Sequence, residues 1–179
     1  MPTKPCVLIA VLCLIPSALF AQQQPTSAQN PANDPAHDPA HHDAVTARGD
    51  HAMGFSHETT THHFHLAKSG GVIDVSANDP KDSATRDQVR MHLAHIVKLF
   101  SAGDFDVPMF NHATNPPGTP VMAKLRGEIR YRYLETDRGA QIQITTANSE
   151  ALEAIHAFLR FQISDHQTHD STEIQPTPR

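Results

Sequence analysis

Histidine is the residue type in this chain whose number and spacing could do chemistry. The 179 residues include 14 histidines, and three of them, His62, His63 and His65, crowd one short segment. Near neutral pH an imidazole can serve as a metal ligand, as a titrating switch or as an ordinary polar group. A single half-buried histidine is more often structural, with its ring satisfied by a backbone carbonyl. The functional question is therefore which of these roles the histidines of this chain take.

The segment Thr59–Ala67 alternates between apolar and polar residues, which is typical of a strand with one buried face. His62 falls on the same side as Phe64, toward the expected core. His63 and His65 share the opposite side and could chelate an ion together. Since a buried histidine needs a hydrogen-bond partner or a metal, His62 is a candidate ligand.

Other histidines lie at the edges of apolar helix faces or in a loop. His92 and His95 stand three residues apart on a predicted helix, close enough to share an ion. Met91 is adjacent, and a thioether favours Cu(I). We hypothesise that three or four inward-facing histidines converge on a metal ion, drawn from His62, His92, His112 and His156.

The first 21 residues have the three regions of a secretory signal peptide. Lys4 supplies a positive charge, Val7–Leu14 is apolar, and Ala21 is a small residue at the predicted cleavage point. The apolar run is shorter than the ~20 residues needed to cross a bilayer, which argues against the alternative of an uncleaved anchor. We expect a periplasmic or secreted protein with no membrane insertion after signal cleavage.

Both cysteines, Cys6 and Cys13, lie inside this signal peptide. The exported chain therefore has no disulfides and no thiolate ligands. Any metal chemistry must use histidine, carboxylate or methionine, a composition that suits copper or zinc. The formal net charge of -5 and the lack of a basic stripe argue against a nucleic-acid partner.

The composition divides the rest of the chain into three parts. Residues 22–50 are rich in proline, glutamine and histidine and predict a disordered tether. Residues 51–170 predict a single α+β domain, and residues 171–179 a disordered tail.

Within the domain, one arrangement occurs twice. Strand patterns at residues 59–67 and 72–77 flank a glycine-containing turn and precede a helix that ends near Gly103. Strand patterns at 128–134 and 141–146 again flank a turn and precede a helix that begins after Asn148. The two strand-turn-strand-helix halves predict a four-stranded antiparallel sheet with two helices on one face.

Residues 104–127 interrupt this arrangement with a long connection. Its four prolines stiffen it, and apolar residues such as Phe105 and Met122 indicate that it packs against the domain. A long packed loop in a small domain is often functional. We expect it to form a lid or wall of a site and to carry His112.

Several segments match a pattern beyond local structure. They are Met53-Gly54-Phe55, Thr61-His62-His63-Phe64, Gly70-Gly71-Val72-Ile73, Arg90-Met91-His92-Leu93, Gly103-Asp104-Phe105, Pro116-Pro117-Gly118, Ala154-Ile155-His156, Phe161-Gln162-Ile163, His166 and Thr168. Through them, residues 53–170 resemble a family of exported bacterial proteins of uncharacterised activity. In that family pattern a glycine follows the threonine near the end, where this chain has His169.

The resemblance implies a domain boundary and a shortlist of site residues, but no activity. As candidate metal ligands it favours His62, His63, His92, His112, His156 and His166. Together with the composition, it leads to the hypothesis of an exported binding protein that holds a copper or zinc ion.

Two other functions stay open. One is a small non-catalytic interaction module, dimeric or bound to a periplasmic protein, whose histidines are structural or respond to pH. The other is a hydrolase or isomerase with His112 or His156 as general base. The chain has no phosphate loop, nucleophile elbow or HExxH motif, so the sequence favours a non-enzymatic role.

Overall fold

The computed structural model describes residues 39–175, which form an α+β fold. The helices and strands are, in chain order, α1 (Pro39–Met53), β1 (Thr60–Ala67), β2 (Gly70–Ala77), α2 (Ser83–Ala102), α3 (Asp106–His112), α4 (Thr119–Lys124), β3 (Ile129–Thr136), β4 (Gly139–Thr146) and α5 (Ser149–Asp165). Short 3-10 turns, η3 (His57–Thr59) and η4 (Arg126–Glu128), precede β1 and β3.

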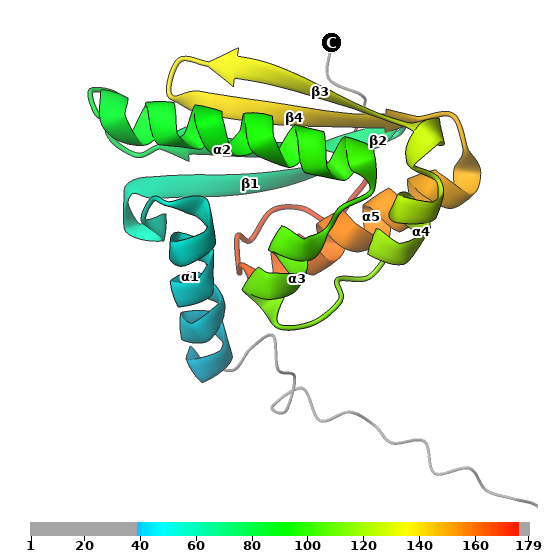
Figure 1. The fold of residues 1–179 in the computed structure, drawn as a ribbon, viewed down its shortest axis with the longest axis horizontal. Coiled ribbons are helices and arrows are strands. Elements are labelled where there is room, and N and C mark those ends of the chain that lie inside the picture. Colours follow the sequence, from blue (N-terminus) through cyan, green and yellow to red (C-terminus); the bar gives the residue numbers. More distant parts are fainter. Residues whose placement is uncertain (1–38, 176–179) are drawn as a thin grey trace, which may run out of the picture.

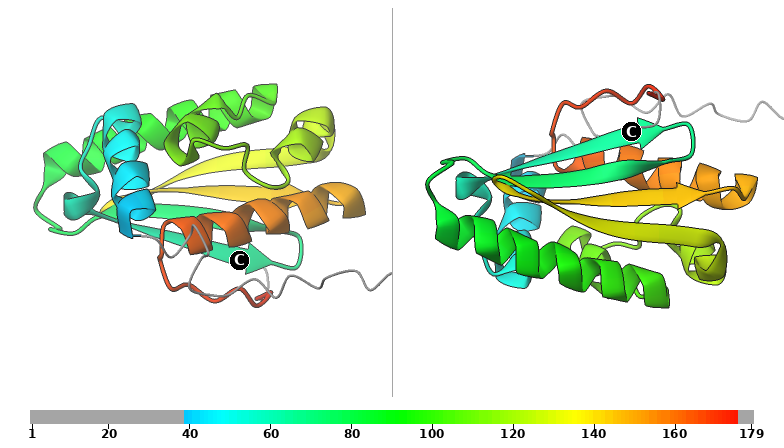
Figure 2. Two further views of the ribbon diagram at one scale, coloured as in Figure 1. Left: turned by 90° about the horizontal axis from the view of Figure 1, so that it is seen from below. Right: turned by 90° about the horizontal axis from the view of Figure 1, so that it is seen from above.

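The four strands form one antiparallel sheet in the order β1-β2-β4-β3. Helices α2 and α5 lie on the same face of this sheet (Figure 1). The view onto the other face shows the strands uncovered by any described helix (Figure 2). The predicted architecture of two strand-turn-strand-helix halves is confirmed.

Each long helix packs on the strands of the other half. Helix α2 follows β1 and β2 but packs mainly on β3 and β4, whereas α5 follows β3 and β4 and packs most on β1. The two halves therefore share a single core, because neither helix covers its own hairpin alone. The largest fully buried side chains of this core include Leu66, Ile142, Ile144, Ile155 and Leu159.

Strand β1 confirms the predicted alternation. Phe64 and Leu66 are 3% and 0% exposed, whereas His63 and His65 lie on the open face. His62 is half-buried on the inner face, opposite Val75 of β2. The period-two geometry of a strand is sufficient to place these side chains.

Local capping sets the ends of the long helices. The Asp82 carboxylate accepts the Thr85 N–H at 3.0 Å and starts α2, which ends where Gly103 adopts φ 81°. The Asn148 side chain accepts the Ala151 N–H at 3.1 Å and starts α5. These ends agree with the sequence prediction.

The predicted boundary between tether and domain at residue 51 is wrong. Residues 39–50 belong to helix α1, which lies against α3. Val45 is 1% exposed, and the Arg48 Nε–H donates to the Asn111 carbonyl at 2.8 Å. The helix was not predicted because its apolar surface is small and its contacts are made with a distant segment.

The connection over residues 104–127 packs down as expected, although it is not a plain loop. It contains the short helices α3 and α4, which place Phe105 and Met122 in the core at 7% and 0% exposure. His112 ends α3 and is 2% exposed.

The first part of the predicted disordered tail is also ordered by contacts with β1. The Gln175 N–H donates to the Leu66 carbonyl at 2.8 Å, and the Lys68 N–H donates to the Gln175 carbonyl at 3.2 Å. Further upstream, the Asp170 carboxylate accepts the Phe64 N–H at 2.8 Å. Residues 170–175 therefore cover part of the exposed edge of β1, where backbone groups would otherwise lack partners.

The predicted signal peptide, residues 1–21, and residues 22–38 of the predicted tether lie outside the described residues. Over the part of the chain that is described, no helix is long and apolar enough to cross a membrane.

The close packing of β4 against β2 leaves no room for a side chain at Gly139. A Cβ at this position would lie 2.0 Å from the Val75 carbonyl oxygen. Gly139→Ala is expected to reduce the free energy of unfolding by about 2 kcal/mol or more, since the two strands would have to move apart. Urea unfolding measures this change.

The matched control is Gly127→Ala, because a Cβ at Gly127 meets nothing within 4 Å. This variant should unfold within about 0.5 kcal/mol of the wild type. Equal stability of the two variants would contradict the described pairing of β2 with β4.

Candidate functional site

Two neighbouring cavities lie on the helix-covered face of the sheet, at the end where β1 begins. The inner cavity has a volume of about 70 Å³ and is mostly apolar, with polar groups contributed by His62, His92, Asn111, His112, Gln162 and His166. The outer cavity has a volume of about 240 Å³ and is lined by His42, Val45, Thr46, Gly49, Met53, His57, Thr60, Thr61, His62, His63, His166 and Thr168. Met53, His62 and His166 line both cavities.

Four different elements deliver histidines to the inner cavity. His62 comes from β1, His92 from α2, His112 from the end of α3, and His166 from the residue that follows α5. The ring of His166 lies 4.9 Å from that of His112 and 6.0 Å from that of His62, measured between centroids. Phe55 contacts the rings of both His62 and His92, at 6.4 and 5.7 Å.

Burial keeps three of these histidines in the neutral form at pH 7. It lowers the pKa of His62 to about 4, with a further contribution from His63. Burial also lowers the pKa of His92 to about 4, together with the nearby His62 and His95. The pKa of His166 falls well below its ordinary value for the same reason, reinforced by His112 and His62. A neutral imidazole is the form that binds a metal ion.

The same three side chains have no hydrogen-bond partners in the described part of the chain. No group within residues 39–175 donates to or accepts from the ring nitrogens of His62, His92 or His166. His62 stacks on His166, and the three rings contact the aromatic rings of Phe55 and Phe64. All three side chains are half-buried, whereas a fully buried histidine is usually satisfied by a backbone carbonyl.

His112, by contrast, is held by a buried polar network. Its Nδ1 lies 2.5 Å from Asp165 Oδ2, and its Nε2 lies 3.1 Å from Gln162 Oε1. The second oxygen of Asp165 is 2.9 Å from Nε2 of His41, which belongs to α1. One buried carboxylate therefore links the N-terminal helix to the histidine at the end of α3.

The hydrogen bonds to Asp165 determine its charge. Burial alone would raise the pKa of this carboxyl, but the hydrogen bonds from His112 and His41 hold its pKa below the ordinary value. Asp165 is therefore ionised at pH 7. Two other polar atoms of the same region, Asn111 Oδ1 and Gln162 Nε2, are buried without a hydrogen-bond partner. Both residues line the inner cavity and leave polar groups there for a ligand.

Two of the six shortlisted histidines do not line the inner cavity. His156 is 6% exposed, and its Nε2 donates to the carbonyls of Ala67 and Gly70 at 2.9 and 3.0 Å. It fixes the turn between β1 and β2. His63 lies on the open face of the sheet, where its Nδ1 pairs with Asp170 at 2.8 Å. The structure thus brings together His62, His92, His112 and His166.

These four rings line the cavity without converging on one point. In the described part of the chain, no three histidine, cysteine, aspartate or glutamate side chains are already placed to hold a metal ion. Ligation by three or more of the histidines would therefore require side chains to rotate toward the cavity.

Sequence reasoning missed several residues of this site, namely His41, Met53, Asn111, Gln162 and Asp165. Two of them had a detectable signal. Gln162 and Asp165 fall on the apolar stripe of α5, in register with Phe158, where polar side chains are unusual. Their burial at 5% and 4% exposure shows that they face the core.

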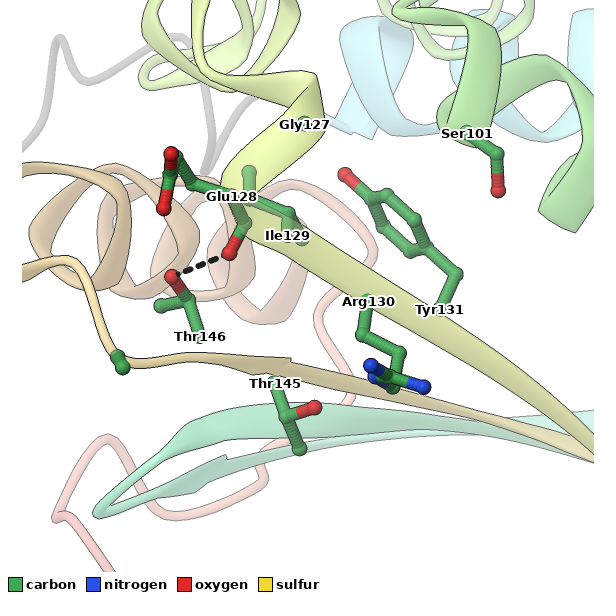
Figure 3. A pocket seen from close by; sticks show the side chains of 9 residues that line it. Ser101, Gly127, Glu128, Ile129, Arg130, Tyr131, Thr145 and Thr146 are labelled. Atoms are coloured by element: carbon green, nitrogen blue, oxygen red, sulfur yellow. Dashed lines mark hydrogen bonds between the residues drawn. The ribbon is translucent and has the colours of Figure 1, made fainter.

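A further hollow, about 630 Å³, is an open groove at the other end of the sheet (Figure 3). The groove passes around the start of β3. Tyr131 and Arg130 are neighbours on this strand and project from its opposite faces (Figure 3). The Tyr131 hydroxyl lacks a hydrogen-bond partner, and burial raises its pKa, so it remains protonated. Because these polar groups do not face a common point, the groove is a weaker candidate than the histidine-lined cavities.

No family model, curated protein or solved structure matches this chain.

The neutral histidines predict a pH-dependent stability. Their unfolded forms bind protons near pH 6.5, whereas folded His62 and His92 bind them only near pH 4. Between these values the unfolded state carries more protons, so the free energy of unfolding falls as the pH is lowered. From pH 7 to pH 5 each histidine should contribute a loss of roughly 2 kcal/mol. His62→Gln should reduce the measured loss by about that amount.

Urea unfolding at pH 7, 6 and 5 tests this expectation. His65→Gln is the matched control, because His65 lies on the same strand but is exposed on the open face. This control should retain the pH dependence of the wild type. Identical pH profiles for the wild type and both variants would contradict a neutral, buried His62.

Proposed function

We propose that this protein is an exported binding protein that holds a transition-metal ion, copper or zinc, in the inner cavity. The ligands are drawn from His62, His92, His112 and His166. One observation carries the proposal: four elements distant in sequence each bring a histidine to one small cavity, and three of these rings are neutral and without hydrogen-bond partners. Export is inferred from the signal-like residues 1–21.

The spacing of the rings supports a shared ion. Two imidazoles on one tetrahedral zinc ion, with bonds of about 2 Å, have centroids roughly 5 Å apart. The centroids of His112 and His166 are 4.9 Å apart, and those of His62 and His166 are 6.0 Å apart. Their nitrogens would reach a common ion only after side-chain rotation, because the rings of His62 and His166 lie parallel in the structure, with an interplanar angle of 3°.

The network around His112 supports the same function. A carboxylate hydrogen-bonded to one ring nitrogen orients the other nitrogen toward a metal and raises its basicity. Asp165 stands in this relation to Nδ1 of His112. Nε2 would be released for the metal when the Gln162 side chain, whose own Nε2 lacks a partner, turns away.

The same residues fit nucleophilic catalysis less well. The His112–Asp165 pair is also the arrangement of a general base. However, the described residues that line the inner cavity include no serine, threonine or cysteine that such a base could activate. Binding therefore accounts for the cavity better than covalent catalysis does.

Metal titration of the exported chain tests the proposal. Isothermal titration with Zn²⁺, and separately with Cu²⁺, should give one ion per chain in the wild type. The double variant His62→Ala, His166→Ala removes two ligands. Loss of a residue that only orients a metal ligand typically lowers metal affinity roughly 10–100-fold. The double variant should lower it by more than this.

The matched control is His65→Ala, which removes a histidine from the open face of the same sheet. It should bind like the wild type, and circular dichroism checks that both variants are folded. Equal weakening in both would place the metal outside the cavity. Failure of the wild type to bind Zn²⁺, Cu²⁺ or, in the absence of oxygen, Cu(I) stoichiometrically would overturn the proposal and favour the interaction module.

A further inference from the structure

The wall between the two cavities contains a soft donor as well as histidines. Met53, His62 and His166 are the three residues that line both the inner and the outer cavity. They come from the end of α1, from β1 and from the residue after α5. The thioether of Met53 and two imidazoles are thus available on the same wall.

Gly49 lies one helical turn before Met53 and is buried on the face of α1 that lines the outer cavity. A Cβ at Gly49 would lie 3.4 Å from the Met53 terminal methyl group, so the methionine side chain runs back along this face of the helix. Met53 is therefore held beside the wall by its position on α1.

Met53, rather than Met91, is therefore the methionine whose position allows it to bind a metal ion at this wall. Met91 is 68% exposed and lines neither cavity. A thioether has little affinity for Zn²⁺, whose usual ligands are thiolate, imidazole and carboxylate, but it selects Cu(I).

We propose that the ion held by this site is Cu(I) and that Met53, His62 and His166 are its ligands. This inference rests on the proposed function and names its metal. Cu(I) is stable with few ligands, which suits a wall where no three nitrogen or oxygen donors already converge.

The outer cavity places further histidines beside the same wall. It is larger than the inner one, at about 240 against 70 Å³. It also carries histidines from α1, η3 and the open face of β1, namely His42, His57 and His63.

Competition titrations of the exported chain test the choice of metal. Cu(I) is titrated without oxygen against bicinchoninate, and Zn²⁺ against a chromophoric zinc chelator. Met53→Leu keeps the size and apolar character of the side chain, so the fold is retained. It should weaken Cu(I) binding on the order of tenfold or more while leaving Zn²⁺ binding unchanged. Met91→Leu, the matched control, should change neither.

X-ray absorption of the Cu(I)-loaded protein gives an independent measurement. The wild type should show a copper–sulfur shell that is lost in Met53→Leu and kept in Met91→Leu. Tight Cu(I) binding with no sulfur shell, or with the same shell in Met53→Leu, would overturn the role of Met53 and leave the proposed function standing. Absence of both Cu(I) and Zn²⁺ binding in the wild type would overturn both.

Discussion

The pairing of β2 with β4 in the middle of the sheet is the constraint on which the rest of the structure depends. Gly71 lies opposite Ile144, Ile73 opposite Ile142, and Val75 opposite Ala140. These pairs put the inner faces of both hairpins on one side, where each long helix covers the strands of the other half. A slip of one residue would turn every inward side chain of one hairpin toward solvent. His62 of β1 lies opposite Val75 of β2, and it faces the cavities only in this register.

This shared core contains an unusual concentration of polar groups at one end. The neutral rings of His62, His92 and His166 gain no hydrogen bonds from the described residues, and two amide atoms nearby are unpartnered. Burying the two amide atoms without partners opposes folding by a few kcal/mol, roughly. Their presence beside a well-packed apolar core is easiest to understand if a ligand satisfies them in the working protein.

Helix α1 connects this polar region to the surface. His41 reaches the buried Asp165 carboxylate, Val45 enters the core, and Met53 lines both cavities. The helix therefore forms part of the site and also part of its cover. A chain that began at residue 51 would lose one of the two partners of Asp165 and much of the wall of the outer cavity.

Much of the fold and part of the site were determined by the sequence alone. Strand alternation placed His62 inside and His63 outside, and capping residues such as Asp82 and Asn148 set the helix starts, because these features depend on neighbours a few residues away. Only the tertiary structure decided which histidines share a cavity, that His156 serves the β1–β2 turn, and that Asp165 and Met53 belong to the site. These contacts depend on how α1, α3 and α5 pack against one another. Local periodicity specifies which face of an element is apolar, but it does not specify which distant element that face meets.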